Sequence, residues 1–151
     1  MTPSVSEGRP TEPIRCAGCE WISLTAKGDE RGSLVAIEQQ RQVPFEIARA
    51  YYLFATQPGV VRGLHAHRAL TQFAVAVNGS CQILLDDGIR RQTVRLNDPA
   101  LGLLLPPMVW HEMSDFSADC VLLVLAGEPY DEADYIRDYD QFRRLAAADG
   151  A

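Results

Sequence analysis

The chain lacks the features that mark several common classes of protein. No apolar run approaches the roughly 20 residues that a helix needs to span a bilayer. Basic residues are in the minority, with 14 Lys and Arg against 20 Asp and Glu, whereas a nucleic-acid partner normally requires a basic stripe. The polar stretch 1–13 has neither the charged start nor the apolar centre of a signal peptide. We therefore expect a cytoplasmic protein with a disordered tail over residues 1–13 and with no membrane or nucleic-acid partner.

Cysteine is too sparse for a structural zinc site. Cys16 and Cys19 form one C-x-x-C pair, but Cys81 and Cys120 have no close partner in the sequence. A zinc site usually needs a second pair at short spacing. Cys81 and Cys120 lie within apolar runs, where a free thiol behaves as a small buried hydrophobe. Because disulfides are rare in the cytosol, we expect four reduced, structural cysteines.

What the chain does contain is a succession of short segments typical of strands. At 151 residues it has the size of one domain, which we place at residues 14–151. Turn signals recur about every 8–12 residues, a spacing that favours an antiparallel sandwich or barrel. Residues 130–148 instead show helical spacing and predict one short and one longer helix packed on the outside. The predicted strands are 21–25, 33–38, 45–55, 73–77, 81–86, 89–96, 101–105, 109–113 and 120–126, with a polar turn at 27–29.

Two of the three histidines, His65 and His67, lie two residues apart in the central stretch 60–79. Side chains alternate along a strand, so both imidazoles project from one face. Two buried polar rings need partners, which indicates a shared polar cavity. Since an unperturbed histidine titrates near pH 6.5, the pair is suited to taking and returning protons. The third histidine, His111, follows another apolar run, and we expect it to contribute to substrate binding.

The H-x-H spacing also fits a metal site. Two strand histidines, a carboxylate a few residues on and a distant histidine would make a complete set of ligands. Here the carboxylate position holds Gln72, a neutral and weaker ligand. We therefore expect no metal and no other cofactor, and we assign Gln72 to the substrate site. A metal site remains the alternative interpretation.

Two arginines flank the histidines. A guanidinium presents a planar fork that suits phosphate or carboxylate, so Arg49 and Arg62 are candidates for substrate binding. The alternative is that both lie on a solvated rim of the barrel. Simple alternation places Arg62 on the face opposite His65, and a bulge at Gly63 would correct this.

Adjacent tyrosines offer a phenol near the histidines. Tyr51 shares a strand face with Arg49, whereas Tyr52 shares the other face with Phe54. We therefore assign Tyr51 to catalysis and expect the Tyr52 face to pack in the core. Trp110 is also expected in the core, and the acidic run 130–135 is most simply the start of a helix.

A family resemblance extends from about residue 29 to residue 142. The chain resembles the sugar 3,4-ketoisomerases of the cupin superfamily, which form antiparallel jelly rolls. The Arg-Gly-Leu-His segment is also similar to that of the dTDP-sugar 3,5-epimerases, which lack a second histidine like His67. The resemblance implies no role for the C-x-x-C pair. The motifs that carry the resemblance are Arg62-Gly63-Leu64-His65-Ala66-His67, Gln72, Asn78-Gly79-Ser80, Asp86-Asp87-Gly88, Trp110-His111-Glu112, Val121-Leu122-Leu123-Val124, Tyr130-Asp131-Glu132 and Asp134-Tyr135-Ile136-Arg137.

The resemblance implies an activity. Members of that family move the carbonyl of dTDP-4-keto-6-deoxyglucose from C4 to C3 without a metal, act as homodimers and serve the synthesis of deoxyamino sugars. It also implies that His65 and His67 are proton carriers with Tyr51 nearby. The alternatives are a 3,5-epimerase, a metal-binding cupin oxygenase and a sugar-nucleotide-binding module without activity. The last of these would not require both histidines.

Overall fold

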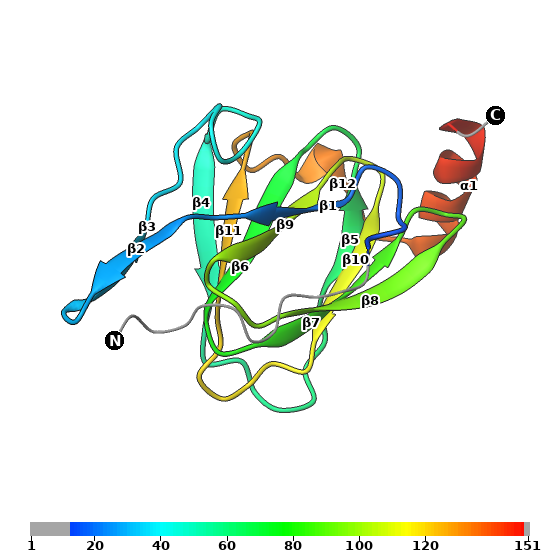
Figure 1. The fold of residues 1–151 in the computed structure, drawn as a ribbon. Helices are drawn as coiled ribbons and strands as arrows, with labels where there is room; N and C mark the ends of the chain where they lie inside the picture. The colour runs from blue at the N-terminus through cyan, green and yellow to red at the C-terminus, as the bar shows by residue number, and fades with distance from the viewer. Residues whose placement is uncertain (1–12, 150–151) are drawn as a thin grey trace.

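The computed structural model describes residues 13–149, which form mainly antiparallel strands (Figure 1). Two sheets of five strands face each other, and a two-stranded hairpin projects from one side. The expected antiparallel jelly roll is therefore confirmed. In chain order the elements are β1 Glu20–Ser23, β2 Ala26–Asp29, β3 Gly32–Val35, β4 Arg49–Leu53, β5 Arg62–His67, β6 Gln72–Asn78, β7 Cys81–Asp86, β8 Arg91–Leu96, β9 Leu101–Leu105, β10 Trp110–Ser114, β11 Val121–Ala126, the 3-10 helix η1 Glu132–Asp134, β12 Tyr135–Ile136 and α1 Tyr139–Asp149.

The two large sheets interleave strands that are distant in sequence. The first has the order β1-β9-β6-β11-β4, and the second has the order β12-β5-β10-β7-β8. The strand β5, which carries both histidines of the H-x-H pair, thus lies between β10 and the two-residue strand β12. Residues from three separate parts of the chain therefore meet around this strand.

The apolar runs are continuous because both faces of each sheet are covered. Alternate residues of β6, such as Ala74 and Ala76, belong to the main core between the sheets. Phe73 and Val75, which point the other way, pack under the segment 35–47 on the outside of the first sheet. A strand covered on both faces needs apolar residues at every position, which explains why β6, β9 and β11 show little alternation.

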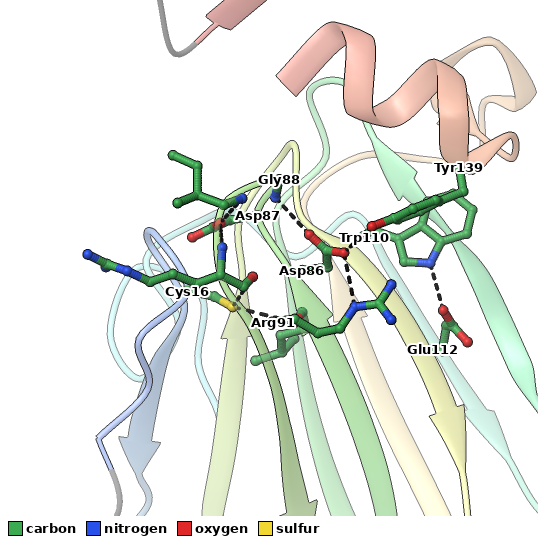
Figure 2. Close-up of polar contacts among 11 residues, drawn as sticks. Cys16, Asp86, Asp87, Gly88, Arg91, Trp110, Glu112 and Tyr139 are labelled. Atoms are coloured by element: carbon green, nitrogen blue, oxygen red, sulfur yellow. Dashed lines mark hydrogen bonds and ion pairs between the residues drawn. The ribbon is translucent and has the colours of Figure 1, made fainter. Parts of the chain in front are cut away.

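The C-terminal helix covers the outer face of the second sheet. Phe142 of α1 packs on Trp110 and Ala66 in a separate cluster. Figure 2 shows how polar contacts fix this helix: the buried carboxylate of Asp86 accepts hydrogen bonds from the Tyr139 hydroxyl at 2.6 Å and from Arg91 Nε at 3.2 Å. The helix is therefore attached to the sheet by both apolar and charged contacts.

Most predicted strands are confirmed, and three expectations need correction. The polar turn expected at 27–29 is the strand β2. The turn lies instead at residues 30–31, because Asp29 accepts hydrogen bonds from the Arg31 backbone and guanidinium. The side chains of Tyr52 and Phe54 do not pack in the core but are each 64% exposed, because β4 is the outermost strand of its sheet. The acidic run begins a short 3-10 helix, as expected, but the chain then returns to a strand, β12.

Three other expectations concern the cysteines, the N-terminal tail and membrane-spanning helices. Cys16, Cys19, Cys81 and Cys120 are buried free thiols, as expected. The tail predicted for residues 1–13 lies, apart from Pro13, outside the described residues. In the part of the chain that the structure describes, no helix is long and apolar enough to cross a membrane.

Candidate active site

The strand β5 directs its histidines between the two sheets. Ala66 points outward and packs in the cluster beneath α1. Because neighbouring side chains alternate, His65 and His67 both point inward. The same alternation on β10 places Trp110 beneath α1 and His111 on the inner side. The three histidines of the chain thus share one interior face.

Strand register then brings specific side chains together. His111 lies directly opposite His65, and Tyr135 of β12 lies directly opposite His67. The His65 ring lies 4.6 Å from the His111 ring and 4.8 Å from the His67 ring, measured between centroids. The Tyr135 ring contacts both members of the H-x-H pair, with its centroid 4.8 Å from that of His65 and 4.5 Å from that of His67.

A bulge in β5 places Arg62 on the same strand face as His65. The pairing of β5 with β10 shifts register between the His111 and Met113 positions. At this point Gly63 has φ +73°, a left-handed conformation that suits glycine. The extra residue brings Arg62 to the face of His65, and both line the same cavity. The bulge predicted at Gly63 is confirmed.

Two cavities open beside the histidines. The larger, with a volume of about 660 Å³, is lined by residues that include His65, Arg62 and Tyr51. A smaller cavity of about 390 Å³ reaches His67. Arg49, Tyr130 and Tyr135 line both, so these three side chains form the boundary between the two cavities.

Other predicted residues lie behind this surface. Gln72 is buried and donates a hydrogen bond from Nε2 to the Tyr51 hydroxyl at 2.8 Å. His111 is also buried, behind His65. Among the described residues, neither Gln72 nor His111 lines the two cavities. The structure therefore brings all seven predicted residues into one region, but these two face their neighbours rather than the open space.

Arg49 has an unusual environment for a cation. Its guanidinium carbon lies 5.1 Å from the centre of the Tyr51 ring and 5.6 Å from that of Tyr130. Its Nε and Nη2 atoms are buried and have no hydrogen-bond partner within residues 13–149. A buried donor without a partner is costly, so this guanidinium is suited to receiving an anion. Arg62, by contrast, is exposed at the rim.

The surroundings keep the histidines neutral. Burial, reinforced by His111 and His67, lowers the pKa of His65 to about 2. Burial and the nearby His67 lower the pKa of His111 to about 4. Burial also lowers the pKa of His67, although the Asp134 carboxylate opposes this shift. Burial chiefly raises the pKa of Tyr51, so its phenol keeps its proton. The region thus combines neutral imidazoles, which can accept protons, with a phenol that can donate one.

Sequence reasoning missed the contribution of the segment 130–137. Asp134 lies 2.9 Å from Nδ1 of His67, and Tyr135 packs on two histidines. The local pattern of this run indicates the start of a helix, and η1 does begin there, capped by Asp131. The available signal was the presence of Asp134 and Tyr135 in the motifs shared with the ketoisomerases, but the local pattern gave no reason to place them at the site.

Three imidazoles in one place also suggest a metal. Ligand nitrogens of His65, His67 and His111 all lie within 4.8 Å of one another. Gln72, which the H-x-H pattern puts where a carboxylate ligand would stand, donates its amide to Tyr51 instead. A neutral amide supplies no charge to balance a divalent ion, so the set lacks the charged ligand of the metal site that the pattern predicts.

Comparison with known proteins establishes the family. Residues 17–147 match the family model FdtA, described as WxcM-like, C-terminal. The chain belongs to the FdtA family. A curated member, the TDP-4-oxo-6-deoxy-alpha-D-glucose-3,4-oxoisomerase of Aneurinibacillus thermoaerophilus, is 55% identical over 119 residues, which cover 79% of this chain and 86% of the relative.

Solved structures of sugar 3,4-ketoisomerases share the fold over most of the chain. The 3,4-ketoisomerase QdtA of Thermoanaerobacterium thermosaccharolyticum, solved as a histidine-to-asparagine variant with TDP-4-keto-6-deoxyglucose, is 40% identical with a TM-score of 0.86. The match covers 87% of this chain and 96% of QdtA. The TDP-quinovose 3,4-ketoisomerase WlaRB of Campylobacter jejuni is 47% identical with a TM-score of 0.82, covering 85% of this chain and 98% of WlaRB. The expected resemblance to the sugar 3,4-ketoisomerases of the cupin superfamily is confirmed.

Proposed function

We propose that this FdtA-family chain is a sugar 3,4-ketoisomerase that moves the carbonyl of dTDP-4-keto-6-deoxyglucose from C4 to C3 by histidine acid–base catalysis. The observation that carries the proposal is the group of neutral histidines beside a protonated tyrosine, at a cavity wide enough for a sugar. The names of the similar enzymes support the substrate and the reaction.

The reaction requires proton movement and no net oxidation. A base removes the proton from C3, which is acidic because the C4 carbonyl is adjacent. The C3–H electrons then form a C3–C4 double bond, and the carbonyl oxygen at C4 takes a proton to give an enediol. A proton delivered to C4 and another lost from the oxygen on C3 complete the transfer. Two imidazoles and a phenol supply these steps without a redox cofactor.

We assign His65 to the carbon proton and His67 to the partner role of shuttling or orienting. His65 lines the larger cavity together with Tyr51, whereas His67 borders the smaller one. Tyr51 would protonate or hold an oxygen of the enediol, because its raised pKa keeps the hydroxyl protonated. Gln72 orients that hydroxyl through the 2.8 Å hydrogen bond.

We assign Arg49 to the diphosphate, with Arg62 as a second cation at the rim. Arg49→Ala should raise KM by the equivalent of about 1.5–3 kcal/mol, the usual value of a hydrogen bond to a charged group. Steady-state kinetics would measure this, with Arg143→Ala on the exposed side of α1 as the matched control. Unchanged KM in both Arg49→Ala and Arg62→Ala would place the phosphates elsewhere.

We further propose a cytoplasmic homodimer. Tyr52 of the edge strand β4 and Phe54, which directly follows the strand, are an exposed aromatic pair with ring centroids 6.0 Å apart, and apolar side chains in such a place favour association. The four free thiols agree with a reducing compartment. Sedimentation analysis of Phe54→Asp tests the dimer, since an unchanged dimer would remove this face from the interface.

The decisive experiment uses dTDP-4-keto-6-deoxyglucose in deuterated water. The proposed isomerase should yield a C3 ketone that carries deuterium at C4. Label at C3 and C5 with inverted centres would instead identify a 3,5-epimerase. Binding without any incorporation of label would indicate a module without activity.

A further inference from the structure

Asp134 holds His67 through a contact that no proposed step yet uses. Its Oδ2 lies 2.9 Å from Nδ1 of His67, and His67 is only 3% exposed. Its other oxygen, Oδ1, accepts a hydrogen bond from the backbone N–H of Ala69 at 2.8 Å. The Asp134 carbonyl accepts a further hydrogen bond from the backbone N–H of Arg68. Each carboxylate oxygen therefore has a defined partner, one in the last residue of β5 and one just after the strand.

This arrangement decides which nitrogen of His67 carries the proton. A carboxylate can only accept, so the Nδ1 of a neutral His67 must be the donor. Its Nε2 is then the acceptor. The Nε2 atoms of His65, His67 and His111 are all buried and have no hydrogen-bond partner within residues 13–149. One ring nitrogen from each of the three imidazoles lies within 4.8 Å of the others, and the buried Nε2 of His67 is shielded from bulk water.

We propose that Asp134 is the positioning residue of His67: it fixes the ring and holds the Nδ1–H tautomer, which makes Nε2 the proton-accepting atom. The inference deepens the proposed function and rests on it for the catalytic part. The same contact stabilises the imidazolium that forms when Nε2 takes a proton, because a negative charge then lies at hydrogen-bond distance from Nδ1. Asp134 remains outside the reacting atoms and acts only through His67.

Asp134→Asn is a sharp test because of the second contact. Ala69 N–H needs an acceptor, so the amide oxygen should take the place of Oδ1. The amide NH₂ then faces His67 Nδ1 and donates to it. That reversal forces the proton onto Nε2 of His67, so Nε2 can no longer accept a proton. The size and position of the His67 side chain stay the same. An aspartate-to-asparagine change of this kind in a serine-protease triad lowers turnover by about 10⁴ through the wrong tautomer.

The first measurement is the tautomer, read from long-range proton–nitrogen NMR correlations of histidine-labelled protein without substrate. With three histidines in the chain, the signals can be assigned from single His→Asn variants. The wild type should show His67 protonated at Nδ1, and Asp134→Asn should show it protonated at Nε2. The control Asp138→Asn removes a carboxylate that caps α1 through Gln141 N–H, and it should leave His67 unchanged. An Nε2–H tautomer in the wild type, or no change in Asp134→Asn, would overturn the inference.

The second measurement is turnover. Asp134→Asn should lower kcat by about 10²–10⁴ with KM changed no more than a few-fold, whereas Asp138→Asn should keep wild-type kcat. A switched tautomer with normal kcat would overturn the catalytic part of the inference. The proposed function is tested separately by His67→Asn: if that variant also turns over normally, the assigned role of His67 fails while the tautomer result still stands.

Discussion

At the scale of single residues, the site obtains its chemistry from burial. Burial removes water from His65, His67 and His111 and holds them neutral, whereas an exposed histidine is partly charged near pH 6.5. A neutral imidazole can start the reaction by accepting a proton without first losing one. Function at neutral pH therefore follows from where these side chains lie and not from an unusual residue.

The two histidines of β5 should be separable by isotope exchange. His65→Asn should abolish exchange of the sugar C3 proton with solvent while dTDP still binds, because His65 is the proposed carbon base. His67→Asn should retain some C3 exchange but block carbonyl transfer. Deuterium wash-in followed by NMR measures both.

Two results would change these assignments. The opposite pattern of exchange in His65→Asn and His67→Asn would reverse the two roles. A loss of turnover below about tenfold in both variants would fall short of the usual 10²–10⁴ contribution of acid–base groups. In that case the histidines would be structural.

Gln72 gives rise to a prediction about metals. Its amide is engaged with Tyr51 and supplies no charge to balance a divalent ion, so turnover should survive exhaustive chelation. Elemental analysis of the purified protein should find less than one metal ion per chain. Loss of turnover in proportion to the metal removed, with recovery on adding one ion back, would contradict this expectation.

At the scale of elements, the bulge in β5 connects the histidines to the rim of the cavity. Gly63→Ala should cost about 1–2 kcal/mol of unfolding free energy, because a side chain disfavours the left-handed backbone. The added Cβ would lie an ordinary 3.5 Å from Met113, so the strain is in the backbone. Relieving it by straightening the strand would return Arg62 to the wrong face and raise KM.

Gly59→Ala is the matched control for the bulge. Gly59 has φ +80° with no atom within 4 Å of an added Cβ, so it should lose similar stability. Its kinetics should stay unchanged. Urea titrations and steady-state kinetics of both variants separate the two effects, and equal kinetics in the pair would show that the bulge does not position Arg62.

The same scale shows what sequence patterns can and cannot predict. The strands around β5 and the bulge were predictable, because alternation and a glycine in the wrong register are local signals. The strand β2, Ala26–Asp29, was missed because it is short and mostly polar. The two-residue strand β12 exists only through its pairing with β5, and nothing in its own sequence predicts it. Asp134 was missed for the same reason, since a helix start and a histidine partner have the same local pattern.

At the scale of the whole molecule, buried neutral histidines make stability depend on pH. The folded-state pKa of His111 is about 4, and the unfolded value is about 6.5. Above pH 6.5 neither state binds the proton. As the pH falls below 6.5, the unfolded chain takes the proton and the folded chain does not, so His111 alone lowers the unfolding free energy by up to about 1.4 kcal/mol per pH unit.

Urea titrations between pH 7.5 and 5 should therefore show stability falling with acid, and less steeply in His111→Gln. The titratable rings that lie beside His111 are those of His65, on the paired strand, and of His67. Their pKa values are also lowered, so they add to the slope in the same direction. Equal slopes in wild type and His111→Gln would contradict the assigned protonation state.

The link between His67 and Asp134 has a consequence for biosynthesis. The two residues are 67 positions apart, so a ribosome incorporates the aspartate long after the histidine strand has been made. Until then the edge of β5 that pairs with β12 is open, and His67 in the nascent chain lacks its contact with Asp134. A shortened chain released before residue 134 should therefore expose an unpaired strand edge and be a natural target for chaperones.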